Sequence, residues 1–476
     1  MKNPGVCLKI TFLQNGSAQM TVMNFQTSAE ALWEVTTFIP PHTTNNHKIS
    51  GGIIMNHHYQ TITEVFDFGP HVSKVILNVG TSLKGAHLET DMFTVFAKRT
   101  SVKGEDYEWP AFMGEQMEDP MEGERKITAI YSSDKNGTSC NDGTYLTLEL
   151  YCDPRDNLGS IIRFDGDHNV FVNFHYTITQ QKPLILSEST LTDLIFDQDD
   201  GNRIIYGEWL KEGFHAHPDM PLSYVYYEPE TETGEKVPLI IWLHGAGEGG
   251  KDTAVAAVGN KVVNLISPEI QAYFGKALLL APQCPTMWMD NGSGEYTTTG
   301  ISMYTEGLEA LIGDFVKEHS DIDTSRIYIG GCSNGGFMTV RMLLRNPDRY
   351  AAAYPVCEAM YDKAMSDDDI RTLAGIPIWF VHAKNDPVVA PEDYVLPTYQ
   401  RIMAAGAGDV HFTYYDNITD PSGKYFLEDG KPFEYVGHWA WVPMLDNRCT
   451  EDFDGSPVTI NGKTVTILEW LAAHHK

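Results

Sequence analysis

The sequence predicts a β-rich N-terminal part followed by a larger α/β domain with a mostly parallel sheet. Up to about residue 185, short runs rich in Val, Ile, Phe and Thr alternate with turn-forming segments, without an amphipathic helix of useful length. Beyond that point, nearly continuous apolar runs alternate with segments of helical periodicity. Strands that helices cover on both faces are apolar throughout, so this alternation predicts a three-layer α/β architecture.

The N-terminal part is expected to contain antiparallel strands linked by loops. In the run VFVNFHYTIT, every second residue is apolar, which places one face of a strand on a core. The expected strands cover residues 6–13, 19–24, 33–39, 75–79, 92–97, 126–131, 145–151 and 170–176. Their spacing is typical of small β-sandwich domains. We therefore expect a small β-rich region at 1–85 and a β-sandwich at 86–184.

The C-terminal part, residues 185–476, is expected to form one α/β domain. Its apolar runs predict strands at residues 237–243, 277–281, 326–329, 351–355, 376–381 and 410–415. Between them, YTEGLEALIGDFVKEH carries apolar residues at the i, i+3, i+4, i+7 spacing of an amphipathic helix. The segment TVTILEWLAAHH predicts a terminal helix.

Composition excludes several classes of protein. The 34 Lys and Arg against 64 Asp and Glu give a formal charge of −30, which disfavours nucleic acids and anionic membrane surfaces as partners. No apolar run reaches the roughly 18 residues of a membrane span. Seven scattered cysteines indicate reduced thiols rather than a disulfide framework or a zinc site. The N-terminal residues lack the features of a signal peptide, so we expect a cytoplasmic protein, or a secreted one whose signal peptide has been removed.

The segment Gly331-Cys332-Ser333-Asn334-Gly335 has the GxSxG pattern of a serine nucleophile. It follows the predicted strand SRIYIG and opens the predicted helix GGFMTVRMLLR, which is the strand–turn–helix context that the pattern requires. Small residues two positions before and after the serine permit a turn tight enough to expose its hydroxyl at the carboxyl edge of the sheet. Ser333 is therefore predicted to be a nucleophile.

A serine hydroxyl needs a base, and in this fold the expected chain order is Ser, Asp or Glu, then His. Among the histidines that follow the penultimate apolar strand, only His438 lies in a predicted loop, where its ring can reach the serine. The others lie in the last strand or at the end of the last helix (His411, His474 and His475). His438 is therefore predicted to be the general base.

Three acidic residues could orient that histidine. Asp386 follows the strand IPIWFVHA and leaves one further strand before His438, so it is the favoured partner. Glu358, after the preceding strand, and Asp416, after the last one, stay as alternatives.

The loop HGAGEGG, residues 244–250, follows the strand VPLIIWL. Its glycines permit close approach of the backbone to a substrate, so the N–H groups of Ala246 and Asn334 are predicted to form a two-donor oxyanion hole. The loop has neither nucleotide-binding pattern, and the chemistry requires no metal and no organic cofactor. His244 and Glu248 are expected to brace the loop.

The motifs HGAGEGGKD, APQCP, GGCSNGG, HAKNDPVV and GHWAW resemble those of the α/β-hydrolase family, in particular bacterial poly(hydroxyalkanoate) depolymerase-like and feruloyl-type esterases. The strand set RKITAIYSS, GTYLTLELY and NVFVNFHYTI is similar to the immunoglobulin-like domain that precedes the hydrolase in two-part esterases. The resemblance implies a Ser333, Asp386 and His438 triad. Such esterases often carry Arg after the loop Glu, where this chain has Gly249.

The leading hypothesis is a serine carboxylesterase that acts on short-chain or aromatic esters, feruloyl or acetyl groups included, as small molecules or linked to polysaccharide. Trp288, Trp439 and Trp441 lie next to the motifs and could wall an apolar pocket. Residues 417–437 could form a partial lid. The β-rich N-terminal region is also suited to holding a homo-oligomer together.

Two other functions compete with this hypothesis. A peptidase of the prolyl-oligopeptidase type shares the triad order, but its propeller domain is much larger than this N-terminal part. A non-catalytic carbohydrate- or partner-binding protein built on β modules would not need all the catalytic elements together.

Overall fold

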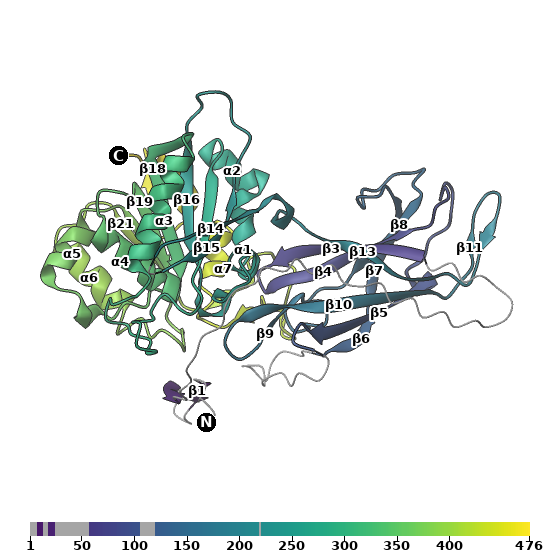
Figure 1. Ribbon diagram of the computed structural model, residues 1–476, viewed down its shortest axis with the longest axis horizontal. Helices are drawn as coiled ribbons and strands as arrows, with labels where there is room; N and C mark the ends of the chain where they lie inside the picture. The colour runs from purple at the N-terminus through teal and green to yellow at the C-terminus, as the bar shows by residue number, and fades with distance from the viewer. Residues whose placement is uncertain (1–6, 13–17, 24–56, 105–119, 219) are drawn as a thin grey trace.

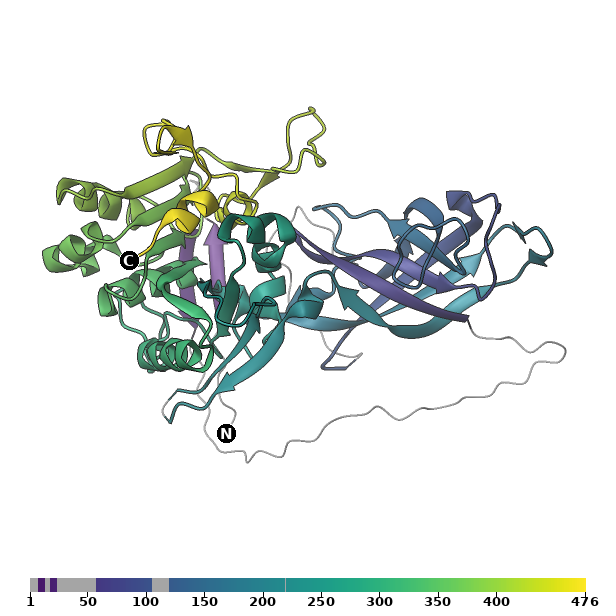
Figure 2. The ribbon, with the colours of Figure 1, turned by 90° about the horizontal axis from the view of Figure 1, so that it is seen from above.

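The computed structural model describes residues 7–12, 18–23, 57–104, 120–218 and 220–476. A short hairpin near the N-terminus pairs β1 (Cys7–Phe12) with β2 (Ala18–Met23). The strand expected at 33–39 lies outside the described residues. The rest forms a β domain and an α/β domain that lie side by side along the long axis of the molecule (Figures 1 and 2).

The β domain packs its strands in layers around one core. Its strands are β3 (His57–Phe66), β4 (Gly69–Asn78), β5 (Phe93–Ser101), β6 (Glu122–Arg125), β7 (Ile127–Ser133), β8 (Tyr145–Leu150), β9 (Ile162–Phe164), β10 (Asn169–Gln180) and β13 (Ile195–Ile204). The strand order is β6-β5-β10-β13-β3-β4-β8-β7, and β13 joins the two layers by pairing with β10 and then with β3. Side chains of β4, β5, β8 and β10 share the core. The predicted β-sandwich is therefore confirmed.

The predicted domain boundaries were misplaced. Strands β3 and β4 pair with β13 and β8, so a boundary at residue 85 falls inside the β domain. Strand β13 extends that domain to Ile204, beyond the boundary expected at residue 185. Small elements complete the domain: η1 (Thr90–Met92), β11 (Leu184–Ile185) and β12 (Thr190–Leu191).

The α/β domain contains the predicted, mostly parallel sheet. Its strands are β14 (Lys211–His215), β15 (Leu222–Tyr227), β16 (Val237–Leu243), β17 (Leu278–Gln283), β18 (Ile322–Cys332), β19 (Ala352–Val356), β20 (Ile378–Ala383) and β21 (Val410–Tyr415). The order is β14-β15-β17-β16-β18-β19-β20-β21, and the pairs from β17 to β21 are parallel. At one edge of the sheet, β14 pairs antiparallel with β15, and β15 pairs antiparallel with β17.

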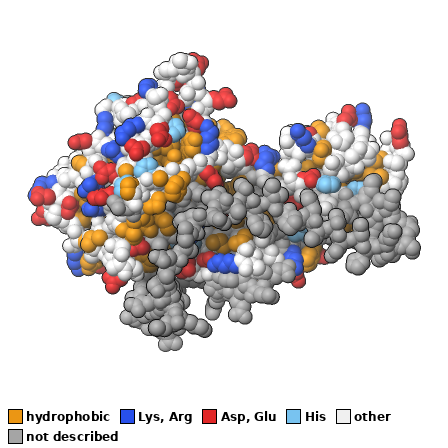
Figure 3. All heavy atoms as spheres, in the orientation of Figure 1, with side chains coloured by type: hydrophobic (Ala, Val, Ile, Leu, Met, Phe, Trp, Pro, Cys, Tyr) orange, Lys and Arg blue, Asp and Glu red, His pale blue; other side chains and the backbone are white. Residues whose placement is uncertain are grey.

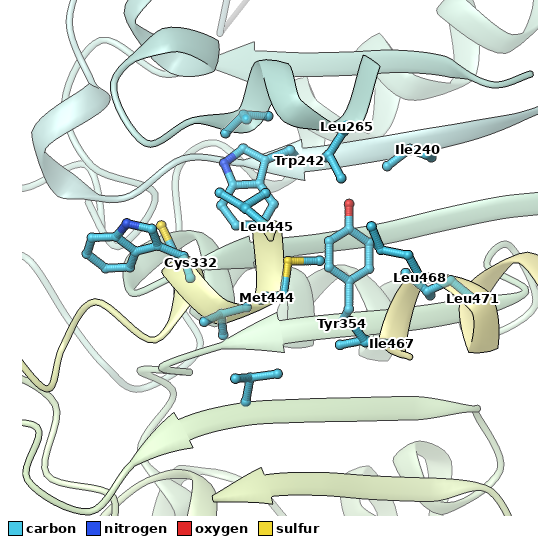
Figure 4. Packing of buried hydrophobic residues seen from close by; sticks show 14 of the residues in the cluster. Ile240, Trp242, Leu265, Cys332, Tyr354, Met444, Leu445, Ile467, Leu468 and Leu471 are labelled. Atoms are coloured by element: carbon cyan, nitrogen blue, oxygen red, sulfur yellow. The ribbon is translucent and has the colours of Figure 1, made fainter. Parts of the chain in front are cut away.

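Helices cover both faces of this sheet. The main helices are α1 (Val255–Val258), α2 (Pro268–Phe274), α3 (Thr305–Glu318), α4 (Asn334–Arg345), α5 (Asp367–Ala374), α6 (Val395–Ala404), α7 (Trp441–Leu445) and α8 (Ile467–Ala473). Helices α3 to α6 pack on one face of the sheet, and α1, α2, α7 and α8 pack on the other. Both faces offer apolar side chains to the helices, because successive residues of each strand point to opposite faces. Figure 4 shows the second face, where side chains of α7 and α8 meet Trp242 and Tyr354.

Shorter elements link these layers. They are η2 (Gly207–Trp209), η3 (Ala246–Glu248), η4 (Val262–Ile266), η5 (Asp362–Ala364), β22 (Ile418–Thr419), β23 (Glu434–Tyr435), β24 (Thr459–Ile460) and β25 (Lys463–Thr464). Lys261, just before η4, connects the two domains: its Nζ lies 2.7 Å from Asp67 and 2.6 Å from Asp446.

Acidic and basic side chains are interspersed on the face shown in Figure 3, and hydrophobic side chains gather on part of the α/β domain. Within the described residues, no helix has the length and apolar character needed to cross a membrane. Six cysteines in the described part of the chain are free thiols.

Candidate active site

Ser333 lies at the turn between β18 and α4, as the GxSxG pattern predicts. Its backbone has φ 58° and ψ −119°, a conformation that L-residues rarely adopt and that is typical of a strained functional turn. The Ser333 N–H donates to the carbonyl oxygen of Val356 at 2.9 Å, which fixes the turn to the end of β19. The side chain is only partly buried.

The glycines around Ser333 are required by close backbone packing. A Cβ at Gly331 or at Gly335 would overlap the carbonyl oxygen of Leu243, the last residue of β16. The turn that carries Ser333 therefore lies directly against the start of the 244–250 loop, which brings the two predicted halves of the oxyanion hole together.

His438 and Asp386 form the predicted pair. The Nδ1–H of His438 donates to Oδ2 of Asp386 at 2.8 Å, since a carboxylate can only accept. Asp386 is 6% exposed, and burial alone would raise its pKa. The nearby charge of His438 and hydrogen bonds from His382 and His438 outweigh burial and hold the pKa of Asp386 well below its ordinary value. Asp386 is therefore a carboxylate that orients the His438 ring.

The alternative acids and histidines have other partners. Glu358 is fully buried and accepts the N–H of Met360, and Asp416 pairs with Lys384 at the surface. His411 pairs with Asp409 and Asp452, and His474 pairs with Asp409.

Ser333 and His438 are held near the same strand end. Cys357 follows Val356, the acceptor of the Ser333 N–H, and its thiol donates to the carbonyl oxygen of His438 at 3.3 Å. The Cys357 sulfur, an Asp386 oxygen and a His438 ring nitrogen lie within 4.8 Å of one another. Burial raises the pKa of the Cys357 thiol well above its ordinary value, so this thiol remains a donor.

The predicted oxyanion donors begin two helical segments. Asn334 is the first residue of α4 and Ala246 is the first residue of η3. The first N–H groups of a helix lack an intrahelical acceptor, so both can point at a ligand. The Asn334 side chain is used elsewhere, because its Oδ1 accepts the N–H of Trp288 at 2.9 Å.

His244 and Glu248 brace the loop, as expected. Nδ1–H of His244 donates to Gly245 O at 2.6 Å, and its Nε2 accepts the N–H of Cys284 at 3.1 Å. Because burial lowers the pKa of His244 to about 4, the ring stays neutral and can make both bonds. Burial raises the pKa of Glu248 to about 7, against hydrogen bonds that favour the carboxylate.

The three tryptophans have different roles. Trp288 is fully buried against His244 and Tyr304, so the prediction that it walls a pocket is corrected to a packing role. Trp441 meets the His438 ring edge-on at 5.6 Å between centroids and stacks on Trp439, which is partly exposed. Trp441 therefore packs on the His438 ring, and Trp439 packs on Trp441.

The segment expected to form a lid contacts the β domain. The Tyr425 ring lies edge-on to Phe68 at 5.3 Å, and Arg155 Nη1 donates to Phe426 O at 3.4 Å. At its end, β23 leads into His438 within three residues.

Sequence reasoning missed His382. Its Nε2 lies 2.9 Å from Asp386 Oδ2 and 3.0 Å from Val389 O. The sequence does contain a signal for this residue, because His382 lies four positions before Asp386, in the strand that precedes this acid.

Two protein families match parts of the chain. Residues 58–192 match the family described as Esterase Ig-like N-terminal domain, and residues 228–429 match the family described as Phospholipase/Carboxylesterase. The fold and these matches define an α/β-hydrolase preceded by an immunoglobulin-like domain. These matches identify an esterase of the serine hydrolase class. No curated protein matches the sequence.

Among solved structures, a thermostable esterase shares the fold. It is 24% identical, with a TM-score of 0.69 over 88% of this chain and 100% of that chain. An S-formylglutathione hydrolase from Agrobacterium tumefaciens is 14% identical, with a TM-score of 0.33 over 43% of this chain and 86% of that one. An acylaminoacyl peptidase from Pyrococcus horikoshii is 16% identical, with a TM-score of 0.34 over 52% of this chain and 44% of that one.

Proposed function

We propose that the chain hydrolyses short-chain or aromatic carboxylic esters through an acyl-enzyme on Ser333. The observation that carries the proposal is the 2.8 Å bond between His438 and Asp386, beside a serine in a strained turn. That arrangement supplies an oriented base for an otherwise weak nucleophile.

Each step has a residue of this chain assigned to it. The Ser333 oxygen attacks the ester carbonyl while His438 takes its proton, and the N–H groups of Ala246 and Asn334 hold the resulting oxyanion. His438 then protonates the leaving alcohol, and the C–O bond of the ester breaks. A water molecule, deprotonated by His438, attacks the acyl group, releases the acid and restores Ser333. Asp386 stabilises the imidazolium in both halves of the reaction.

Apolar residues next to the acid and the base support an apolar or aromatic substrate group. Val388, whose N–H donates to Asp386 at 2.8 Å, is 40% exposed, and Val436, two residues before His438, is 50% exposed. With Trp439, they are partly or largely exposed apolar residues within two positions of Asp386 or His438 in the chain, which favours an apolar subsite. Feruloyl and acetyl esters, free or linked to polysaccharide, are the substrates that we propose to test first.

Hydrolysis of p-nitrophenyl acetate, butyrate and octanoate tests the proposal. We expect rapid turnover of the short esters and its loss in Ser333→Ala, while Ser456→Ala, an exposed serine far along the chain, keeps the wild-type rate. An initial burst of p-nitrophenol equal to the enzyme concentration would support the acyl-enzyme. Turnover that survives in Ser333→Ala would refute the assignment.

The substrate class has its own test. Val436→Asp should raise the KM for p-nitrophenyl butyrate and methyl ferulate more than that for the acetate, because a charge replaces apolar surface. Val102→Asp, which changes an equally exposed valine of the β domain, is the matched control. An equal change for all three esters would contradict an apolar subsite at Val436.

A further inference from the structure

A turn of the immunoglobulin-like domain packs against the loop that carries Ala246. Strand β10 begins at Asn169, and the Asn169 Nδ2–H donates to Oε1 of Glu248 at 3.1 Å. A Cβ at Gly247 would lie 2.8 Å from the Asn169 side-chain nitrogen, so Asn169 can approach the loop only because residue 247 has no side chain. Figure 1 shows this end of the domain, near β9, facing the α/β domain.

The neighbouring residue makes a second contact to the same region. His168 Nε2 lies 3.4 Å from Thr286 O. A Cβ at Gly249 would overlap Thr286 O and would lie 2.9 Å from the His168 ring. Residue 249 therefore has no room for a side chain, because Thr286 O and the His168 ring of the other domain occupy the place of its Cβ.

Glu248 transmits the Asn169 contact to the catalytic loop. Glu248 is 4% exposed, and its carboxyl accepts the Asn169 hydrogen bond. Burial raises the pKa of this carboxyl, while Asn169, the Gly245 N–H and the Asn260 side chain act in the opposite direction and favour the charged form. A Cβ at Gly245 would lie 2.9 Å from Glu248 Oε2 and 3.3 Å from the sulfur of Cys332. The Glu248 carboxyl and the sulfur of Cys332, the residue that precedes Ser333, therefore both pack against Gly245, the residue that precedes Ala246.

We propose that Asn169 is a positioning residue for ester hydrolysis: through Glu248 it fixes Gly245, whose carbonyl oxygen accepts the Glu248 N–H at 3.3 Å and shares a peptide bond with the Ala246 N–H, so that this N–H points at the oxyanion. The immunoglobulin-like domain is thereby part of the catalytic apparatus. The proposal rests on the proposed function. A buried carboxyl that loses a donor must reorient or recruit water, and either change moves the peptide bound to it.

The test uses substitutions in the full-length enzyme. Asn169→Asp sets a second carboxyl against Glu248, and we expect kcat for p-nitrophenyl butyrate to fall about tenfold or more with KM within about twofold, because an oxyanion donor acts in the transition state. Asn173→Asp, an exposed position on the same strand, adds the same charge and should leave kcat unchanged. Asn169→Leu removes the donor without adding charge and should also lower kcat.

A reversed pair separates positioning from general structural damage. When Asn169→Asp is combined with Glu248→Gln, the donor and the acceptor exchange places: the amide introduced in the catalytic loop donates to the carboxylate introduced at the start of β10. The kcat of this double variant should therefore return to within about threefold of the wild-type value, because the hydrogen bond between the two domains is restored.

Two results would overturn the proposal. Either Asn169→Asp and Asn169→Leu both fold and keep the wild-type kcat, or the reversed pair folds and restores nothing. Each of these results, obtained with an active wild type, leaves the esterase assignment intact, whereas an inactive wild type would remove the esterase assignment itself.

Discussion

His382 donates to the same carboxylate oxygen of Asp386 that receives the hydrogen bond of His438. The two distances are 2.9 Å and 2.8 Å, and both His382 and Asp386 are buried. Asp386 Oδ1 accepts the N–H groups of Val388 and Val389 at 2.8 and 3.0 Å. The carboxylate is thus held by four hydrogen bonds, which restrict the rotation of the His438 ring bound to it.

Removing the His382 donor should therefore lower activity. A hydrogen bond to a charged group contributes about 1.5–3 kcal/mol, so we expect His382→Leu to reduce kcat at least about tenfold. His382→Gln keeps a donor in this place and should recover most of the rate. Steady-state kinetics on p-nitrophenyl butyrate, with thermal unfolding to verify the fold, checks this; equal losses in both variants would contradict it.

The choice of Asp386 over the other acids can be decided by three amide substitutions. Asp386→Asn removes the charge and favours the wrong tautomer of His438, so kcat should fall by about 10⁴. Asp416→Asn changes an exposed carboxylate paired with Lys384 and should leave kcat unaltered. Glu358→Gln should also retain activity, because Glu358 has no bond to His438. A larger loss in either of these two than in Asp386→Asn would reverse the assignment.

The strained backbone of Ser333 predicts a gain in stability when activity is removed. At φ 58° and ψ −119° a non-glycine residue costs about 1–3 kcal/mol. Ser333→Gly should therefore unfold with a free energy about 1 kcal/mol higher than Ser333→Ala, although both variants are inactive. Urea unfolding of the two measures the difference, and a lower value for the glycine variant would argue against strain at this turn.

Whether a strand could be predicted from the sequence depends on the burial and polarity of its residues. Buried central strands such as β16 and β20 were found because helices cover both faces and make them apolar throughout. Edge strands β14 and β15 were missed because most of their residues are partly exposed. Strand β3 was also missed, because its buried Thr61 and Thr63 are polar and both donate to Asn202.

The same reasoning applies to the site. Ser333 and His438 could be found because a tight turn and a fixed chain order constrain their neighbours. Asn169 could not, since its bond to Glu248 spans 79 residues and joins two domains without a shared pattern. The burial of Trp288 could not be predicted either, because it depends on contacts with His244 and Tyr304, which come from other segments of the chain.

The free energy of unfolding should depend on pH through the titration of His411. Burial would lower its pKa, but hydrogen bonds to Asp409 and Asp452 outweigh burial and raise it to about 9. Asp409 is shared with His474, and Asp452 also accepts the Phe412 N–H. Because the unfolded pKa is about 6.5, the stabilisation is complete below that pH and is lost as pH rises through 9.

We therefore expect the free energy of unfolding to fall by about 2–3 kcal/mol between pH 6.5 and 10 through this group. His411→Gln, which cannot titrate, should be less stable than the wild type at pH 6 and should lose less stability over the same interval. His87→Gln, which changes a highly exposed histidine, is the control. Unfolding curves at a series of pH values measure the effect; parallel profiles for the wild type and His411→Gln would show that His411 is not protonated in the folded protein.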